Sequence, residues 1–370
     1  MRKEDLNAVV NQYFPRAVLY SEDENTLTYL IVDHYPDVSE RFSKIYEVMT
    51  REGHYPLLVK EGEDTVLKVT KKASRRGFSG KIVFALFAVT IASVMYTGYL
   101  SVQAYNKVLG LVGSTTSYGS TGFNVILFTL AVLTPLFLHE LGHYIEARRG
   151  RVPSSFPFPI PAPVVSPLGT FGAIMLMRYL PKSLRDLLKL GLSGPLVGVS
   201  LSIVVFGLSY SFSPTIPMSA VQAGVSKGLL APVSVAPLSA LIISQLRPSP
   251  EGFTTLMNPA AEAAYLILLI HFANLLPIGQ LDGGHVFRAL TSMRTHYWAS
   301  IGVSALAIIY SFVAPSMGWL AFFVVLAWIL SGMRPHLGTA NLLSSLDNRE
   351  KAKYAGIYVL LLVLTFPVIT

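Results

Sequence analysis

The sequence predicts a polytopic α-helical membrane protein with about seven transmembrane helices, a re-entrant β-hairpin and a small N-terminal α/β domain. Hydrophobic residues make up 52% of its 370 residues and charged residues only 14%, against roughly 25% charged residues in an ordinary soluble domain. The mean hydropathy is +0.52. Several apolar runs reach the roughly 20 residues that a helix needs to cross a bilayer. The lipid bilayer is therefore the expected surroundings of most of the chain.

Residues 1–70 have the pattern of a small soluble α/β module. Short stretches rich in β-branched and aromatic residues predict strands, and apolar residues at helical spacing predict one helix. The expected order is strand, strand, helix, strand, strand, at residues 17–20, 26–32, 36–51, 55–59 and 65–69. No catalytic constellation occurs among these residues, so we expect a folding or recruiting module.

A basic linker, residues 71–81, connects this module to a predicted membrane domain, residues 82–370, whose core is residues 126–290. Seven apolar runs are the expected spans: 82–103, 123–146, 187–211, 260–276, 296–314, 317–332 and 354–369. Positive charge beside a first span favours the cytoplasmic side of a membrane. We therefore expect a multi-pass protein of the cell membrane with a cytoplasmic N-terminal module.

Two connecting segments differ from simple loops. Residues 152–167 are rich in proline, and residues 168–177 contain spaced glycines, which is a poor pattern for a spanning helix. We expect these two stretches to form an extended hairpin that enters the membrane where protein shields its backbone; an interfacial loop is the alternative. Residues 212–258 are expected to be an external loop with a partial helix.

Charge and cysteine content narrow the function. The net charge is +8, but the basic residues lie mostly beside apolar runs, where they act as topology signals and lipid-headgroup contacts. We therefore expect no nucleic-acid partner. The chain has no cysteine, so a metal ion would have to be bound by His, Asp or Glu.

A His-Glu-x-x-His motif lies in the second predicted span, at His139, Glu140 and His143. The i, i+4 spacing puts both imidazoles on one face of a helix, where they can bind one zinc ion. Glu140 points about 100° further round the helix, close enough to act on a water at the metal without binding the metal itself. Ionisable groups at membrane depth are costly and usually functional. The motif therefore predicts a catalytic metal site.

Catalytic zinc usually takes three protein ligands, and Asp282 is the best third candidate. It follows a break in the fourth predicted span, at the same expected depth as the two histidines. Asp-Gly-Gly alone is also an ordinary turn signal, and His285 is the next candidate ligand. Asn274 stands at the start of this break, also at membrane depth, where an interhelical hydrogen bond or a helix terminus is one interpretation of its side chain.

Together these motifs resemble the site-2 protease family of intramembrane zinc metalloproteases, in which His-Glu-x-x-His is combined with N-x-x-P-x-x-x-L-D-G on a later span. The second motif stands here at residues 274–283. The Gly-Thr-Phe-Gly run at 169–172 and Gly-Pro-Leu at 194–196 look like the branch found in archaea and chloroplasts, which has an extra N-terminal domain. The resemblance implies one Zn²⁺ on His139, His143 and Asp282.

The same resemblance implies that Glu140 is the general base and that Asn274 is a polar group near the scissile carbonyl. The expected function is hydrolysis of peptide bonds within or near the transmembrane segments of membrane protein substrates, in regulated intramembrane proteolysis. The alternative is a multi-pass transporter of metal ions or small molecules with a His/Asp metal site. Glu140 favours the protease, because a carrier does not need a non-ligand carboxylate beside its first histidine.

Overall fold

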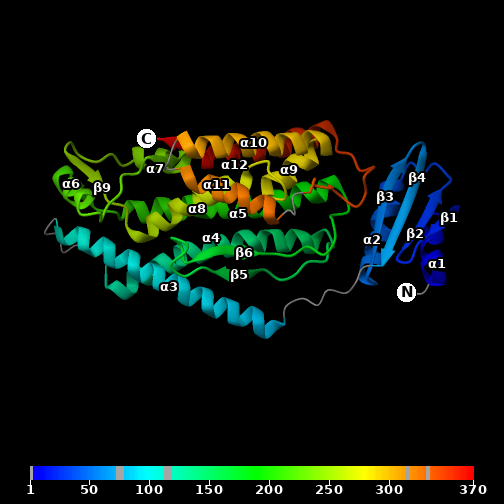
Figure 1. The fold of residues 1–370 in the computed structure, drawn as a ribbon, viewed down its shortest axis with the longest axis horizontal. Coiled ribbons are helices and arrows are strands. Elements are labelled where there is room, and N and C mark those ends of the chain that lie inside the picture. Colours follow the sequence, from blue (N-terminus) through cyan, green and yellow to red (C-terminus); the bar gives the residue numbers. More distant parts are fainter. Residues whose placement is uncertain (1–2, 72–78, 112–118, 314–316, 331–333) are drawn as a thin grey trace.

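The computed structural model describes residues 3–71, 79–111, 119–313, 317–330 and 334–370. A small sheet module lies at one end of an elongated helical body, and the C-terminus lies at the other end (Figure 1). Most of the basic linker used to orient the chain, residues 72–78, lies outside the described residues, as does most of the loop after the first predicted span, residues 112–118.

The N-terminal module is a four-stranded antiparallel sheet with two helices, in the strand order β1-β2-β4-β3. Its elements are α1 (Lys3–Tyr13), β1 (Ala17–Glu22), β2 (Thr26–Ile31), α2 (Val38–Arg51), β3 (His54–Glu61) and β4 (Asp64–Lys71). The four strands and α2 lie where the sequence predicts them. Helix α1 was not predicted, although Leu6 and Val10, four residues apart, are both buried in the shared core.

The helical body contains long and short helices. They are α3 (Gly80–Leu111), α4 (Thr121–Arg149), α5 (Leu184–Ser211), α6 (Met218–Ser226), α7 (Leu238–Gln245), α8 (Pro259–Leu275), α9 (Asp282–Leu290), α10 (Met293–Val313), α11 (Gly318–Leu330) and α12 (Asn348–Thr365). Among the described residues, α3, α4 and α5 are long and apolar enough to cross a membrane, and α8 and α11 are shorter apolar helices. Seven spanning helices are thus not confirmed.

The end of the chain corrects one predicted span. Residues 354–369 were expected to be helical throughout, but α12 ends at Thr365 and Pro367–Ile369 forms strand β10. Strand β10 pairs with β8 (Val235–Pro237), which lies in the segment expected to be a loop with one partial helix. That segment also contains α6, α7 and a pairing of β7 (Thr215–Pro217) with β9 (Phe253–Thr255).

The proline- and glycine-rich stretch between α4 and α5 forms the predicted hairpin. Strand β5 (Phe158–Pro161) pairs antiparallel with β6 (Thr170–Ile174), and both strands lie along α4 and α3 in Figure 1. Ser93 on α3 donates a hydrogen bond of 2.5 Å to the carbonyl of Gly169. Gly169 has a φ of +74°, and a Cβ there would lie 2.7 Å from the Ser93 carbonyl oxygen, so only glycine fits this approach.

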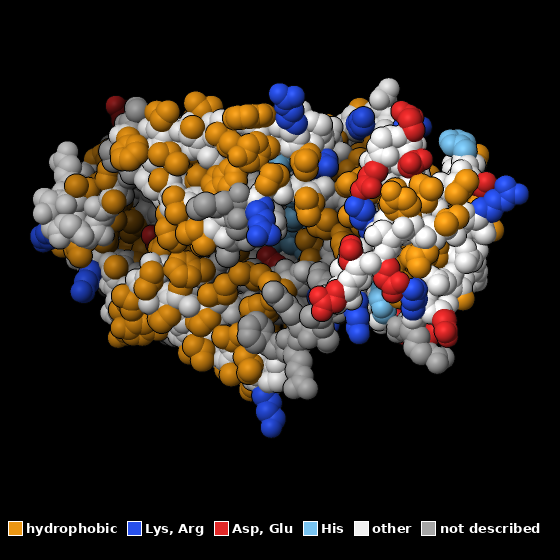
Figure 2. All heavy atoms as spheres, turned by 45° about the vertical axis from the view of Figure 1, so that its right-hand side comes forward, with side chains coloured by type: hydrophobic (Ala, Val, Ile, Leu, Met, Phe, Trp, Pro, Cys, Tyr) orange, Lys and Arg blue, Asp and Glu red, His pale blue; other side chains and the backbone are white. Residues whose placement is uncertain are grey.

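Charged and hydrophobic side chains lie on different parts of the molecular surface. Figure 2 shows Lys, Arg, Asp and Glu gathered on the sheet module, whereas hydrophobic side chains cover most of the helical body. Phe84, Leu306 and Phe312 on the body are 76%, 66% and 82% exposed. An apolar surface of this extent matches the hydrocarbon of a bilayer better than water. The molecule is therefore a membrane protein with a polar end.

Candidate active site

The two histidines expected to bind a metal lie one turn apart on α4. The helix begins beside Ser120, whose hydroxyl accepts a hydrogen bond from the Phe123 N–H and so satisfies one free donor of the first turn. Both His139 and His143 are buried, and their Nε2 atoms are 3.1 Å apart. The i, i+4 spacing thus brings the two rings together, as the sequence predicts.

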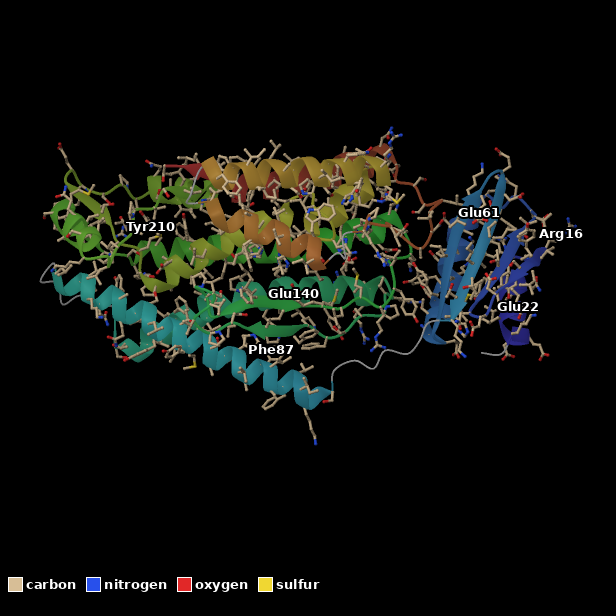
Figure 3. The ribbon with its side chains drawn as sticks, viewed as in Figure 1. Arg16, Glu22, Glu61, Phe87, Glu140 and Tyr210 are labelled. Carbon is tan, nitrogen blue, oxygen red and sulfur yellow. The ribbon has the colours of Figure 1, made fainter. Side chains whose placement is uncertain are left out.

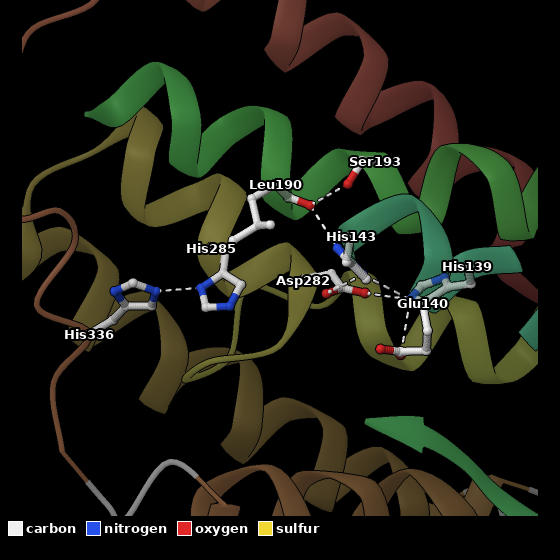
Figure 4. Close-up of polar contacts among 8 residues, drawn as sticks. All are labelled: His139, Glu140, His143, Leu190, Ser193, Asp282, His285 and His336. Carbon is white, nitrogen blue, oxygen red and sulfur yellow. Dashed lines mark hydrogen bonds and ion pairs between the residues drawn. The ribbon is translucent and has the colours of Figure 1, made fainter. Parts of the chain in front are cut away.

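Asp282 completes a cluster with these two histidines. It is the first residue of α9, and its Oδ2 and Oδ1 atoms lie 3.1 Å from His139 Nε2 and 3.2 Å from His143 Nε2 (Figure 4). One ligand atom from each of the three residues falls within 4.8 Å of the others. Two segments 139 positions apart in the chain, at His143 and Asp282, therefore meet at one point inside the helical body.

The donor atoms fit a small divalent cation. A tetrahedral zinc ion with bonds of about 2.0–2.1 Å separates its ligand atoms by about 3.3 Å, close to the 3.1–3.2 Å measured here. Asp282 Oδ2 is buried and forms no hydrogen bond of acceptable geometry among the described residues. Two imidazole nitrogens and a carboxylate oxygen gathered at one point form a donor set suited to a metal ion.

The ring of His143 is oriented by the neighbouring helix α5. Its Nδ1 donates a hydrogen bond of 2.8 Å to the carbonyl oxygen of Leu190, which also accepts from the Ser193 hydroxyl. A proton on Nδ1 leaves the lone pair of Nε2 free for a metal, which is the usual way a protein sets the tautomer of a ligating histidine. The His139 ring instead stacks on His271, with centroids 4.9 Å apart.

Two glycines of α5 make room for the histidine rings. A Cβ at Gly194 would lie 2.1 Å from His143 Nε2, and a Cβ at Gly198 would lie 2.5 Å from His271 and 2.9 Å from His139 Nδ1. The sequence predicted only close helix packing for this Gly-x-x-x-Gly spacing. The spacing of small residues indicates that another group approaches α5 closely. It does not show that this group is a histidine of the donor cluster.

The break between α8 and α9 depends on the Gly-Gly pair after Asp282. A Cβ at Gly283 would lie 1.9 Å from the Leu275 carbonyl oxygen, and one at Gly284 would lie 2.5 Å from the Gly279 carbonyl oxygen. Because the chain folds back on its own backbone here, α9 begins at Asp282. The carboxylate therefore stands at the start of a short helix beside α4.

Glu140 lies beside the donor cluster without belonging to it. Its Oε1 is 3.9 Å from His139 Nε2, and its side chain is 15% exposed. The backbone N–H of Met175, just after β6, is hydrogen-bonded to the Glu140 carboxyl group. Figure 3 places Glu140 within the helical body, far from the charged residues of the sheet module. A carboxylate in this position can exchange a proton with a molecule bound at the cluster.

Three other polar residues, from the fourth predicted span and the break after it, lie at different distances from the donor cluster. Asn274 is partly buried in the last turn of α8, and no hydrogen bond from its side chain is found among the described residues. His271 contacts the site through its ring. His285 is instead paired with His336: its Nδ1 lies 2.5 Å from His336 Nε2 (Figure 4). His336, which sequence reasoning missed, lies in a polar segment that carries no local motif.

Fold and site together define a membrane protein with a buried two-histidine, one-carboxylate metal-binding cluster. Residues 127–314 match Peptidase family M50, so the chain belongs to that family. The match covers His139, Glu140, His143 and Asp282 together. It therefore supports the resemblance to site-2 proteases drawn from the two motifs.

Curated relatives are similar over the same part of the chain. The "Probable zinc metalloprotease EGY2, chloroplastic" of Arabidopsis thaliana is 32% identical over 200 residues, which is 52% of this chain and 34% of the relative. The "Probable zinc metalloprotease EGY1, chloroplastic" of Oryza sativa subsp. japonica is 31% identical over 166 residues, 42% of this chain and 26% of the relative. The chain thus spans between about a quarter and a third of the length of the relatives it matches. No solved structure matches significantly.

Proposed function

We propose that this protein is a zinc metalloprotease that hydrolyses peptide bonds within or near transmembrane segments of membrane proteins. The observation that carries the proposal is the placement of Glu140: it lies beside a complete His-His-Asp donor set, outside it, within an apolar helical body. Membership of a peptidase family and the names of the chloroplast relatives support the proposal.

His139, His143 and Asp282 would hold the zinc ion, and three protein ligands are the usual number at a catalytic zinc site. Bound zinc supplies Lewis acidity, which polarises a peptide carbonyl and acidifies a water molecule. Glu140 takes a proton from that water as the water oxygen bonds to the carbonyl carbon. Glu140 then gives the proton to the amide nitrogen as the carbon–nitrogen bond breaks. Asn274 would donate a hydrogen bond to the carbonyl oxygen as negative charge develops there.

A transmembrane substrate must be unwound locally before its peptide bond is attacked, and its freed backbone groups then need partners. We propose that the outer edge of β6 supplies them by strand addition. Leu176 donates its N–H to Ser155 Oγ within the hairpin, so by alternation Ala173 and Met175 face the opposite edge. An apolar cavity of about 290 Å³ lies beside this edge, lined by Phe87 and Phe137 among others.

We further propose that the protein is a multi-pass protein of the cell membrane, with the sheet module on the cytoplasmic side. Lys and Arg beside the first span support this orientation. We also propose that the sheet module, the basic linker and the membrane domain are separate domains of the chain, and that the substrates are cleaved in regulated intramembrane proteolysis.

Zinc removal tests the proposal against a transporter. The purified protein should cleave a model transmembrane peptide, lose that activity after treatment with a chelator and regain it when one equivalent of Zn²⁺ is returned. Sealed vesicles that contain the protein should not accumulate zinc. Zinc accumulation without cleavage of any transmembrane peptide would favour the transporter instead.

A further inference from the structure

The polar segment between α11 and α12, residues 334–347, joins the sheet module to the helical body. Leu58 on the edge strand β3 donates its N–H to the Ala340 carbonyl at 2.9 Å, and Leu342 donates its N–H to the Leu58 carbonyl at 2.9 Å. Ala340 is fully buried in the core of the module. The segment therefore extends the sheet of the module by one short parallel pairing.

The same segment reaches α9 through a buried histidine. His336 is 3% exposed, and its Nε2 lies 2.5 Å from His285 Nδ1 (Figure 4). The Gly338 N–H donates to His336 Nδ1 at 2.9 Å, so the proton of a neutral His336 ring must be on Nε2, where it is donated to His285. Burial lowers the pKa of His336 to about 2, which keeps the ring neutral.

A second contact fixes the same two elements together. Arg288, one turn beyond His285 on α9, donates from Nε to the His336 carbonyl at 3.1 Å and from a terminal nitrogen to the Leu337 carbonyl at 3.3 Å. Helix α9 also packs against Gly191 of α5, where an added Cβ would lie 3.0 Å from the Asp282 carbonyl oxygen and 3.0 Å from the His285 Cβ. Helix α9 is thus held between α5 and the 334–347 segment.

Helix α9 has only nine residues and begins at Asp282. Isolated helices of this length are not stable by themselves, so the contacts along α9 decide where its first residue lies. His285 is three residues after Asp282, one helical turn away, on the same short rigid element. A shift of this helix would move the carboxylate away from the two imidazoles.

We propose that His336 is a positioning residue for the metal centre: by its hydrogen bond to His285 it fixes α9, and with it the Asp282 carboxylate, against a segment that the N-terminal module holds. The inference rests on the proposed role of Asp282 as a zinc ligand. On this proposal the N-terminal module helps to hold the metal centre in place, although the module contributes no ligand.

The test measures the apparent zinc affinity of the full-length, metal-free protein by competition with a chromophoric chelator. His336→Ala should weaken zinc binding about tenfold, at the lower end of what loss of an outer hydrogen-bond partner costs. His336→Gln should restore the affinity, because its amide N–H can occupy the position of Nε2–H. His54→Ala is the control, since His54 is a buried histidine of the module whose Nδ1 lies 3.0 Å from the Glu52 carbonyl.

A double-mutant cycle assigns the effect to Asp282. In an Asp282→Ala background, His336→Ala should cause no further loss of zinc affinity, because the carboxylate through which it acts is gone. Wild-type affinity in His336→Ala would overturn the inference, and so would a further tenfold loss in the Asp282→Ala background. If Asp282→Ala itself binds zinc as tightly as the wild type, the proposed ligand set fails and the inference fails with it.

Discussion

Individual residues of the metal centre are held by contacts that leave no room for a methyl group. Gly194 faces His143 so closely that a Cβ would lie 2.1 Å from the ring atom Nε2, the proposed ligand atom. The His143 ring is fixed on its other side by the Leu190 carbonyl. The ring therefore cannot move away from an added methyl group without losing either the hydrogen bond or its place in the donor set.

Gly194→Ala should consequently release zinc and destabilise the protein by about 1–3 kcal/mol, the usual cost of overpacking a tight core. Gly207→Ala is the matched control on the same helix, since its Cβ would meet Ile243 only at 3.8 Å. Zinc content by mass spectrometry and thermal unfolding should change for Gly194→Ala and not for Gly207→Ala. Equal zinc content in the two variants would show that Gly194 does not determine the position of His143.

Asp282→Ala should lower the zinc content of the purified protein to well below one per chain. Two imidazoles alone leave a divalent ion with too few ligands, and loss of one of three ligands weakens binding strongly. Asp186→Ala, which removes a carboxylate at the start of α5 outside the donor set, should keep its zinc. Unchanged zinc in Asp282→Ala would point to a different third ligand, with His285 the first to test.

The motif residues could be predicted from the sequence because their chemistry is local: two histidines at i, i+4 and a carboxylate between them need only a helix. That Asp282 lies beside the two histidines could be predicted because it follows a glycine-flanked break at the same expected depth; its role as a ligand stays a prediction. His336 could not be predicted, since its partner His285 is 51 positions away and no periodicity links them. The role of Asn274 stays a prediction.

At the scale of elements, the hairpin and the break after α8 bring the proposed substrate edge and the proposed third ligand to α4. The hairpin was predicted because proline and spaced glycines are incompatible with a spanning helix and compatible with extended chain. The end of α12 was predicted wrongly because residues 366–369 are apolar, and hydropathy alone does not distinguish a helix from strand β10. Helix α1 was missed although its apolar residues recur at helical spacing.

Ala173→Pro should reduce cleavage of a transmembrane peptide while leaving the zinc content unchanged. Proline removes the N–H that is proposed to bind the unwound substrate at the outer edge of β6. Ala173→Ser keeps the N–H and changes the side chain by one hydroxyl, so it is the matched control. Wild-type cleavage by Ala173→Pro, measured alongside its zinc content, would mean that the substrate does not pair with this edge.

For the whole molecule, the proposed topology puts the sheet module and segment 212–258 on opposite sides of the membrane. The chain has no cysteine, so a single introduced cysteine is the one thiol that can be labelled. Its labelling shows on which side of the membrane that position lies. Composition and hydropathy predicted the membrane body and the polar N-terminal module. The count of seven spans could not be established from hydropathy, because the apolar helices α8 and α11 are too short to cross a bilayer by their length alone.

Asp23→Cys, in the β1–β2 turn, should be protected from a membrane-impermeant maleimide in intact cells, and Lys227→Cys, after α6, should react. Both positions are exposed on the protein itself, so a difference in labelling would come from the membrane. Permeabilised cells should label both positions and serve as the control. Reaction of Asp23→Cys in intact cells would place the module outside.

The most direct test of the proposed function is the pair of measurements, zinc content and peptide cleavage, on Glu140→Gln. The substitution removes the proposed base and leaves all three ligands in place, so we predict one zinc per chain and cleavage reduced at least 100-fold, as expected for loss of a general base. The wild type, purified in parallel, should contain zinc and cleave the same peptide. Zinc lost together with activity would make Glu140 a ligand, and cleavage at the wild-type rate would contradict its role as the base.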